Sequence, residues 1–96
     1  MQTTDVLFRK EKEGTILAVF PYDISTLEGS ITCYAHLGQH SSMTWDYLRS
    51  TKPVKDKREY ADLYAELKSI GYDLRVIQKR NYNKYLNELY KVRNEQ

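Results

Sequence analysis

Residues 56–79 read DKREYADLYAELKSIGYDLRVIQK, and this stretch decides the fold class. Asp56 can accept the free backbone N–H groups of a helix start, and Glu59 follows three residues later, as in a capping box. Gly71 suits the left-handed residue that ends a helix. Between these ends, apolar side chains form one helical stripe: Tyr60, Leu63, Tyr64, Leu67 and Ile70. The alternation over 72–79 then predicts a strand, so that a helix crosses over to a late strand.

The segment TILAVFPY, residues 15–22, has apolar side chains at both odd and even positions. A strand that is buried on both faces has this composition, so we expect 15–22 to lie in the centre of a sheet. Pro21 has no N–H to donate, and the ladder of hydrogen bonds should fail near it. The short apolar run Val6–Phe8 predicts an earlier strand, and Gly14 can supply the positive φ that closes a hairpin between the two strands.

Three segments follow in the middle of the chain. Residues 31–37 alternate between apolar and polar side chains, which predicts a half-buried strand with Cys33 facing inward. Residues 38–43, GQHSSM, are typical of a turn. Residues 44–50, TWDYLRS, fit either a strand or a helical turn, and we favour the strand.

The last segment predicts a second helix, over about 81–94, that Asn81 can cap. Its apolar stripe comprises Tyr82, Tyr85, Leu86, Leu89 and Tyr90. Strands grouped first, then a helix, a strand and a helix, indicate an α+β fold. We expect a small, mostly antiparallel sheet of four to five strands with helices packed on it. The domain spans 1–96, and helix 81–94 is either an integral part of it or an appendage.

The composition of the 96 residues is that of one globular domain, with 41% hydrophobic and 29% charged residues. Nine tyrosines stand out against two phenylalanines and one tryptophan. No apolar run approaches the roughly 18 residues of a membrane span, and the first residues lack the pattern of a secretory signal. A single cysteine cannot form an internal disulfide. We therefore expect a reduced, cytoplasmic protein that does not contact a membrane.

Charge is distributed unevenly, although the formal net charge is only +2. Residues 1–48 contain three basic and six acidic residues, whereas residues 49–96 contain twelve basic and seven acidic ones. The basic excess is strongest near the C-terminus, where the candidate binding residues are Arg75, Lys79, Arg80, Lys84 and Tyr85. Aromatic rings among cations can stack on bases while the cations follow the backbone of a nucleic acid. The same pattern also fits a solvated polar face or a protein contact surface.

One constellation invites a test for metal chemistry: Cys33, His36, His40 and Asp46. Cys33 should face away from His36, which removes a third ligand, so we predict no metal. The sequence has no G-x-S-x-G elbow and its four glycines are scattered, so we predict no catalytic residue and no cofactor. His36, His40 and Asp46 are the remaining candidates for a metal site. In the alternative, His40 holds its loop through hydrogen bonds.

The stretches LFRKEKEGTILAVFPY, YAHLGQHSS and EYADLYAELKSIGYDLRVI together resemble a family of small uncharacterised proteins encoded by bacteriophages and conjugative or other mobile elements. The likeness covers Val6 to about Ile77, and its most specific parts are residues 38–40 and 59–72. The resemblance implies an accessory protein of a bacterial cytoplasm and implies no particular activity. It adds Gln39 and His40 to the candidate binding residues.

Three hypotheses about function follow. The first is a small, non-enzymatic protein-interaction module whose partner is a host or phage protein or a second copy, because a net charge of +2 is weak for a dedicated nucleic-acid binder. The alternative is a nucleic-acid-binding module that uses the basic, Tyr-rich C-terminal stripe. The third is a metal-dependent or hydrolytic enzyme at the turn of His36 and His40.

Overall fold

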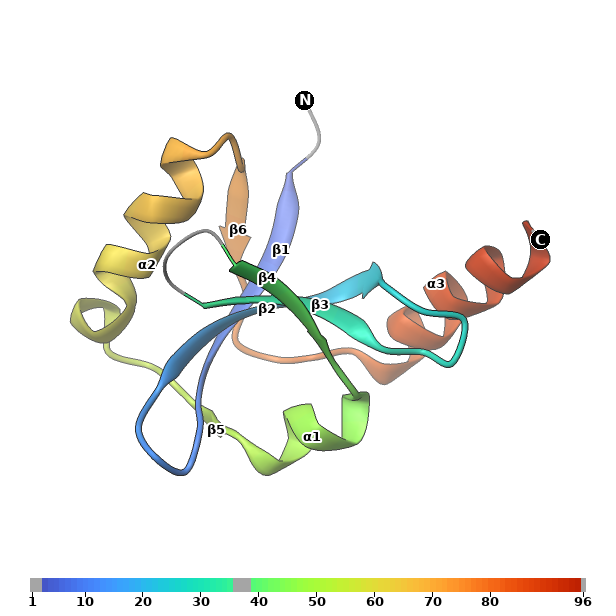
Figure 1. The fold of residues 1–96 in the computed structure, drawn as a ribbon, viewed down its shortest axis with the longest axis horizontal. Coiled ribbons are helices and arrows are strands. Elements are labelled where there is room, and N and C mark those ends of the chain that lie inside the picture. The colour runs from blue at the N-terminus through green and yellow to red at the C-terminus, as the bar shows by residue number, and fades with distance from the viewer. Residues whose placement is uncertain (1–2, 36–38, 96) are drawn as a thin grey trace.

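A computed structural model describes residues 3–35 and 39–95. Strands come first and helices are concentrated in the second half of the chain (Figure 1). In chain order the elements are β1 (Thr4–Lys10), β2 (Ile16–Ile24), β3 (Ile31–Ala35), β4 (Gln39–Met43), α1 (Trp45–Ser50), β5 (Lys52–Pro53), α2 (Lys57–Ser69), β6 (Leu74–Val76) and α3 (Tyr82–Asn94). The chain therefore has the predicted α+β fold, with a sheet that is mostly antiparallel.

The strands are arranged in the order β4-β3-β2-β1-β5, and β6 also pairs with β1. All neighbours are antiparallel except β6, which runs parallel to β1 and aligns Thr4 with Leu74. β5 pairs with the other end of β1, at Arg9 and Lys10. Both short strands thus lie along the edge of β1 that β2 leaves open, and α2 connects them.

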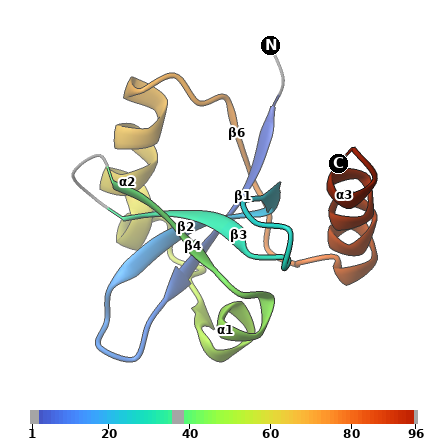
Figure 2. The same ribbon diagram turned by 45° about the vertical axis from the view of Figure 1, so that its right-hand side comes forward.

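Helices cover both faces of this sheet (Figure 2). On one face, Phe8 and Phe20 share a core with Tyr60 of α2, whose ring is stacked on that of Phe8 with centroids 4.0 Å apart. On the other face, α1 and α3 contribute Trp45 and Tyr85 to a separate core. Each face therefore has its own hydrophobic core, and the central strands supply side chains to both.

The prediction of a central strand over 15–22 is confirmed, since its residues reach both cores and Val19 and Phe20 are at most 1% exposed. The register between β2 and β3 shifts between Phe20 and Ile24, around Pro21, as the missing N–H of proline predicts.

Two local predictions are wrong. Residues 39–43 form the edge strand β4 and not a turn; its first residues lack apolar alternation because an edge strand presents polar side chains to solvent, and Ser41 and Ser42 are exposed. Residues 45–50 form helix α1 and not a strand. The side chain of Thr44 accepts the N–H of Tyr47 and so caps the helix.

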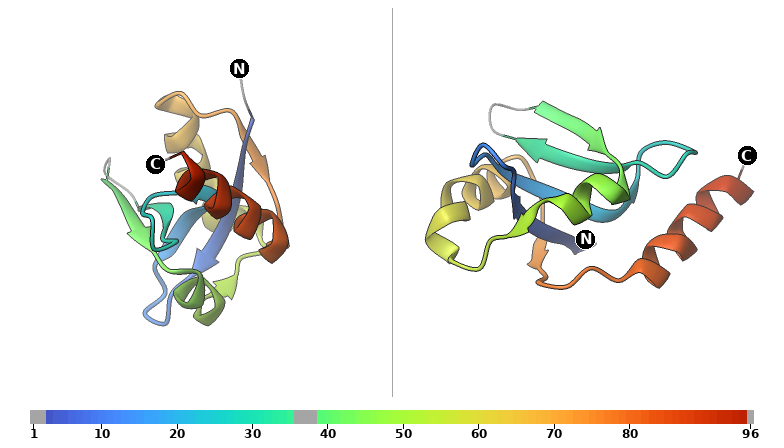
Figure 3. Two further views of the ribbon diagram at one scale, coloured as in Figure 1. Left: turned by 90° about the vertical axis from the view of Figure 1, so that its right-hand side faces the viewer. Right: turned by 90° about the horizontal axis from the view of Figure 1, so that it is seen from below.

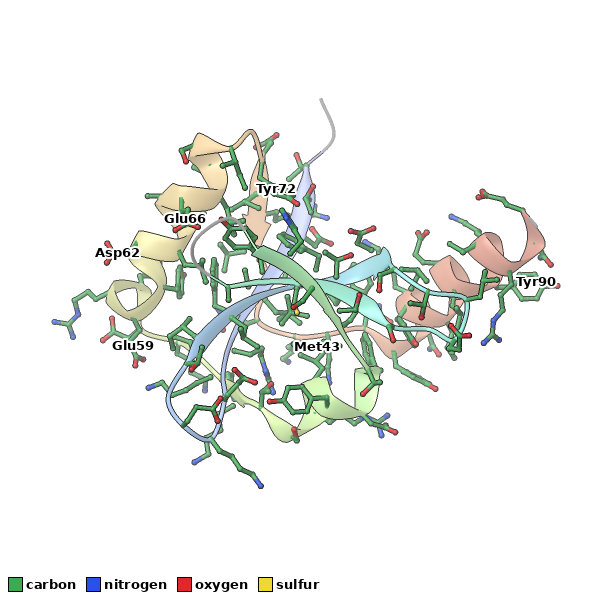
Figure 4. The ribbon with its side chains drawn as sticks, viewed as in Figure 1. Met43, Glu59, Asp62, Glu66, Tyr72 and Tyr90 are labelled. Carbon is green, nitrogen blue, oxygen red and sulfur yellow. The ribbon has the colours of Figure 1, made fainter. Side chains whose placement is uncertain are left out.

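The last helix, α3, buries only part of its predicted stripe. Tyr85 and Leu89 are buried, whereas the exposed side chains are Tyr82, Leu86 and Tyr90. The C-terminal end of α3 extends beyond the sheet (Figure 3), and Tyr90 lies on this outer part, away from the core (Figure 4). The helix is packed through Tyr85 and Leu89, and near its far end the Nε of Arg93 donates to the carbonyl oxygen of Leu27 at 2.9 Å.

Candidate functional site

A pocket of about 810 Å³ lies between α1 and the connection that leads from β6 to α3. Figure 1 shows this connection running alongside α1, below the centre of the sheet. Strand β1 and the chain around β5 complete its walls. The lining residues are Arg9, Trp45, Arg49, Pro53, Lys55, Gln78, Lys79, Arg80 and Tyr82.

Positive charge is concentrated here. Five of the lining residues are cations and none is acidic: Arg9, Arg49, Lys55, Lys79 and Arg80. Arg49 has a weak contact with Asp46, at 3.9 Å, and both side chains are exposed. Within residues 3–35 and 39–95, the other four cations form no ion pair with a carboxylate. A chain of net charge +2 therefore gathers uncompensated positive charge on one surface.

Arg9 is the most buried cation of the pocket, with 5% of its surface exposed. Its Nε donates to Oγ1 of Thr51 at 2.9 Å, and its Nη2 donates to the carbonyl oxygens of Thr51 at 2.5 Å and Leu48 at 3.4 Å. These acceptors lie at the C-terminal end of α1, where the helix dipole favours a cation. Burial lowers the pKa of Arg9, and the positive charge of Arg80 lowers it further. A guanidinium nevertheless stays protonated in proteins. Among the described residues, the hydrogen-bond acceptors of this positive charge are all neutral oxygens.

Aromatic rings form the wall next to these cations. The Trp45 ring is stacked on the buried Tyr85, with centroids 4.3 Å apart, and faces Tyr82 at 5.6 Å. Tyr82 is 46% exposed, and the guanidinium of Arg49 lies over its ring at 5.6 Å. The pocket thus combines an accessible aromatic ring with cations.

The structure divides the predicted basic stripe between two places. Lys79 and Arg80 line the pocket. Arg75 and Lys84 instead bind the carboxylate of Asp5, at 2.6 and 3.3 Å. The hydrogen bond from Arg75 holds the pKa of Asp5 below its usual value. Arg75 and Lys84 therefore belong to a separate ion-pair cluster outside the pocket, where one carboxylate offsets part of their charge.

Tyr85, another candidate binding residue, belongs to the core. Its ring is 6% exposed, and its hydroxyl donates to the carbonyl oxygen of Gly29 at 2.5 Å. Burial raises the pKa of this phenol. The exposed aromatic ring beside the cations is Tyr82 and not Tyr85.

Among the described candidates for a metal site, Cys33, His40 and Asp46 are not brought together. His36 lies outside the described residues, as does the side chain of Gln39. His40 stands in β4, where its Nε2 lies 2.8 Å from the hydroxyl of Tyr72 (labelled in Figure 4). Its ring packs against Tyr34, which belongs to the core under α2.

Cys33 belongs to the core of the opposite face, where its thiol lies 3.1 Å from the hydroxyl of Ser41. Asp46 lies in α1, beside Arg49. In the part of the chain that the structure describes, no three His, Cys, Asp or Glu side chains gather in a way that could hold a metal ion.

Sequence reasoning missed most of the pocket, including three cations, and the residues that it did not single out are Arg9, Trp45, Arg49, Pro53, Lys55 and Gln78. Their cations are scattered from β1 to the chain after β5, and only the fold brings them together. The position of Arg9 could have indicated the site, because residues two apart in a strand point to the same face and Leu7 faces the core. A charged residue at an inward position is a functional or structural signal.

No family model, curated protein or solved structure matches this chain. Among the described residues, no helix has the length and apolar character needed to cross a membrane.

Proposed function

We propose that this protein is a nucleic-acid-binding module whose basic pocket holds the phosphodiester backbone. The observation that carries the proposal is the pocket of five cations without a lining carboxylate. Phosphate contacts by Lys and Arg supply most of the sequence-independent affinity of such proteins. The buried charge of Arg9, held only by neutral oxygens, adds an attraction for an anion.

The sequence alone favoured a protein partner because the net charge is small. We reverse that order because net charge is a poor guide where the acidic residues lie elsewhere. Asp5 pairs with Arg75 and Lys84, and Asp56 and Glu59 pair with other cations outside the pocket. Of the described candidates for enzyme chemistry, Cys33, His40 and Asp46 lie apart.

Fluorescence anisotropy with a labelled oligonucleotide tests the proposal. We expect binding that weakens steeply between about 50 and 200 mM salt. Lys79→Ala and Arg80→Ala should each weaken it and reduce the slope of log affinity against log salt by about 1. The matched control is Lys91→Ala, an exposed lysine of α3 that lies outside the pocket and pairs with Glu88.

Two outcomes would contradict the proposal. The wild-type protein could fail to bind any oligonucleotide at low salt, or Lys91→Ala could weaken binding as much as Lys79→Ala does. The second result would assign the affinity to diffuse charge and not to the pocket.

A second candidate function, a protein contact, is favoured by a separate observation. Tyr82, Leu86 and Tyr90 follow one another at i, i+4 and i+8 on α3 and are 39–68% exposed. Tyrosine is enriched at protein interfaces. Retention of a host or phage protein, or of a second copy, that is lost in Leu86→Ala and Tyr90→Ala but kept in Arg80→Ala would support this function.

The genomic context is also a proposal. The motifs quoted above resemble proteins of phages and mobile elements, and we propose an accessory role in the bacterial cytoplasm on that ground.

A further inference from the structure

We infer that the basic pocket takes an unpaired nucleotide of a single strand, with the base stacked on the ring of Tyr82 and the phosphates among Lys55, Lys79 and Arg80. This inference rests on the proposed function and specifies its ligand. It is carried by the position of the aromatic rings, an observation separate from the charge.

A duplex would make no use of these rings. Its base faces are covered by the neighbouring base pairs, so it offers a protein phosphates and base edges. A single strand exposes base faces, and proteins that bind it combine a basic groove with aromatic rings on which bases stack. The pocket has both features on one wall, since Lys79, Arg80 and Tyr82 are separated by only one residue, Asn81.

The ring of Tyr82 is held in place before any ligand binds. It lies 5.6 Å from Trp45 and 5.8 Å from Tyr85, and these two rings are stacked on each other within the core. The N-cap of α3 fixes the backbone, because Asn81 accepts the N–H of Lys84 at 3.1 Å. A fixed, half-exposed ring loses little conformational entropy when a base stacks on it.

The size and the floor of the pocket fit one nucleotide entering it. A volume of about 810 Å³ is within the range of small-molecule pockets, roughly 300–1,000 Å³. Arg9 is nearly buried, so only a group that enters the pocket can approach it. Among the described residues, the hydrogen bonds of Arg9 use Nε and Nη2, which leaves Nη1 for a phosphate oxygen.

The test compares one labelled oligothymidine, about 12 nucleotides long, alone and annealed to its complement. We expect the single strand to bind at least tenfold more tightly than the duplex. Tyr82→Ala should weaken single-strand binding about fivefold to a hundredfold and leave the salt slope unchanged, because it removes stacking and no phosphate contact. Tyr82→Phe keeps the ring and should bind as the wild type does. Tyr90→Ala, an exposed tyrosine on the same helix but outside the pocket, is the matched control.

Trp45 supplies a second readout that needs no variant. It is the chain's single tryptophan and lines the pocket, so its fluorescence should change on adding the single strand and not on adding the duplex at equal concentration. This measurement remains decisive if Tyr82→Ala fails to fold.

The outcomes separate the two proposals. Equal affinity for single strand and duplex, with Tyr82→Ala binding as the wild type does and Lys79→Ala still weakened, would overturn the inference and leave nucleic-acid binding in place. Binding of neither probe at low salt would overturn both.

Discussion

Arg9 in β1 donates two hydrogen bonds to Thr51, from Nε to the hydroxyl at 2.9 Å and from Nη2 to the carbonyl oxygen at 2.5 Å. This contact joins the last residues of β1 to the C-terminal end of α1. It also fixes the guanidinium at the base of the pocket. The same pair of residues therefore serves the fold and the proposed site.

Thr51→Val tests the structural side of this contact. The change keeps the shape of the side chain and removes the acceptor of a buried Nε–H, so we expect a loss of about 1–3 kcal/mol in the free energy of unfolding. Urea denaturation measures it. Ser50→Ala, which removes an exposed hydroxyl bonded to Tyr47, should stay within about 0.5 kcal/mol of the wild type. Equal effects of the two changes on the free energy of unfolding would show that the buried hydrogen bond from Arg9 to Thr51 does not stabilise the fold.

Gly29→Ala should destabilise the attachment of α3. Gly29 has φ +101°, and a Cβ there would lie 2.5 Å from the hydroxyl of Tyr85 and 3.2 Å from Leu89. Gly14 has φ +95° but nothing within 4 Å, so Gly14→Ala carries backbone strain alone. We expect Gly29→Ala to cost about 1–3 kcal/mol more than Gly14→Ala in urea denaturation. A smaller difference would mean that α3 shifts to make room for the added methyl group.

The ion pairs of Asp5 should make stability depend on acidic pH. The hydrogen bond from Arg75 lowers the pKa of Asp5 in the folded state. The carboxylate thus stabilises the fold fully above the unfolded pKa, about 4, and this contribution is lost as pH falls through the lower folded pKa. Asp5→Asn should lower stability at neutral pH by about 1 kcal/mol and flatten the loss in acid.

Urea midpoints measured from neutral to strongly acidic pH check this dependence. Asp62→Asn is the control, because Asp62 is exposed and forms no ion pair with any described residue. Parallel acid curves for Asp5→Asn and the wild type would contradict the prediction.

Tyr47 should lose its phenol proton only at a higher pH than an ordinary tyrosine. Its hydroxyl donates to the carboxylate of Glu11, and this hydrogen bond raises the pKa of Tyr47 to about 12. The difference between phenolate absorbance titrations of the wild type and Tyr47→Phe isolates this group. Glu11→Gln removes the negative charge and should lower the pKa, whereas an unchanged titration would show that the pair does not form.

The parts of the fold that follow from local patterns could be predicted. The capping residue Asp56 and the apolar stripe from Tyr60 to Leu67 are enough to predict α2. Residues 15–22 have apolar side chains at both odd and even positions, which is enough to predict a central strand. The sheet edge could not be read in the same way. β4 is polar because it is an edge, and the hydrophobic period that marks a strand is absent there.

The candidate site could be predicted only in part. Lys79 and Arg80 are recognisable because they stand in a dense basic stretch. Arg9, Arg49 and Lys55 join them only through the pairing of β1 with β5 and the placement of α1, which are long-range features. The sequence does not reveal that Arg75 and Lys84 pair with Asp5, which stands seventy or more residues earlier.

The parallel pairing of β1 with β6 has a consequence for the growing chain. β1 leaves the ribosome well before its neighbour, since the strand beside Thr4–Val6 is Leu74–Val76, made some seventy residues later. Until then one edge of an apolar strand has open hydrogen-bonding groups, which can pair with the same edge of another nascent chain. Contacts so distant in sequence also close slowly. The vulnerable period of this protein is therefore its own synthesis, and it ends when β6 docks.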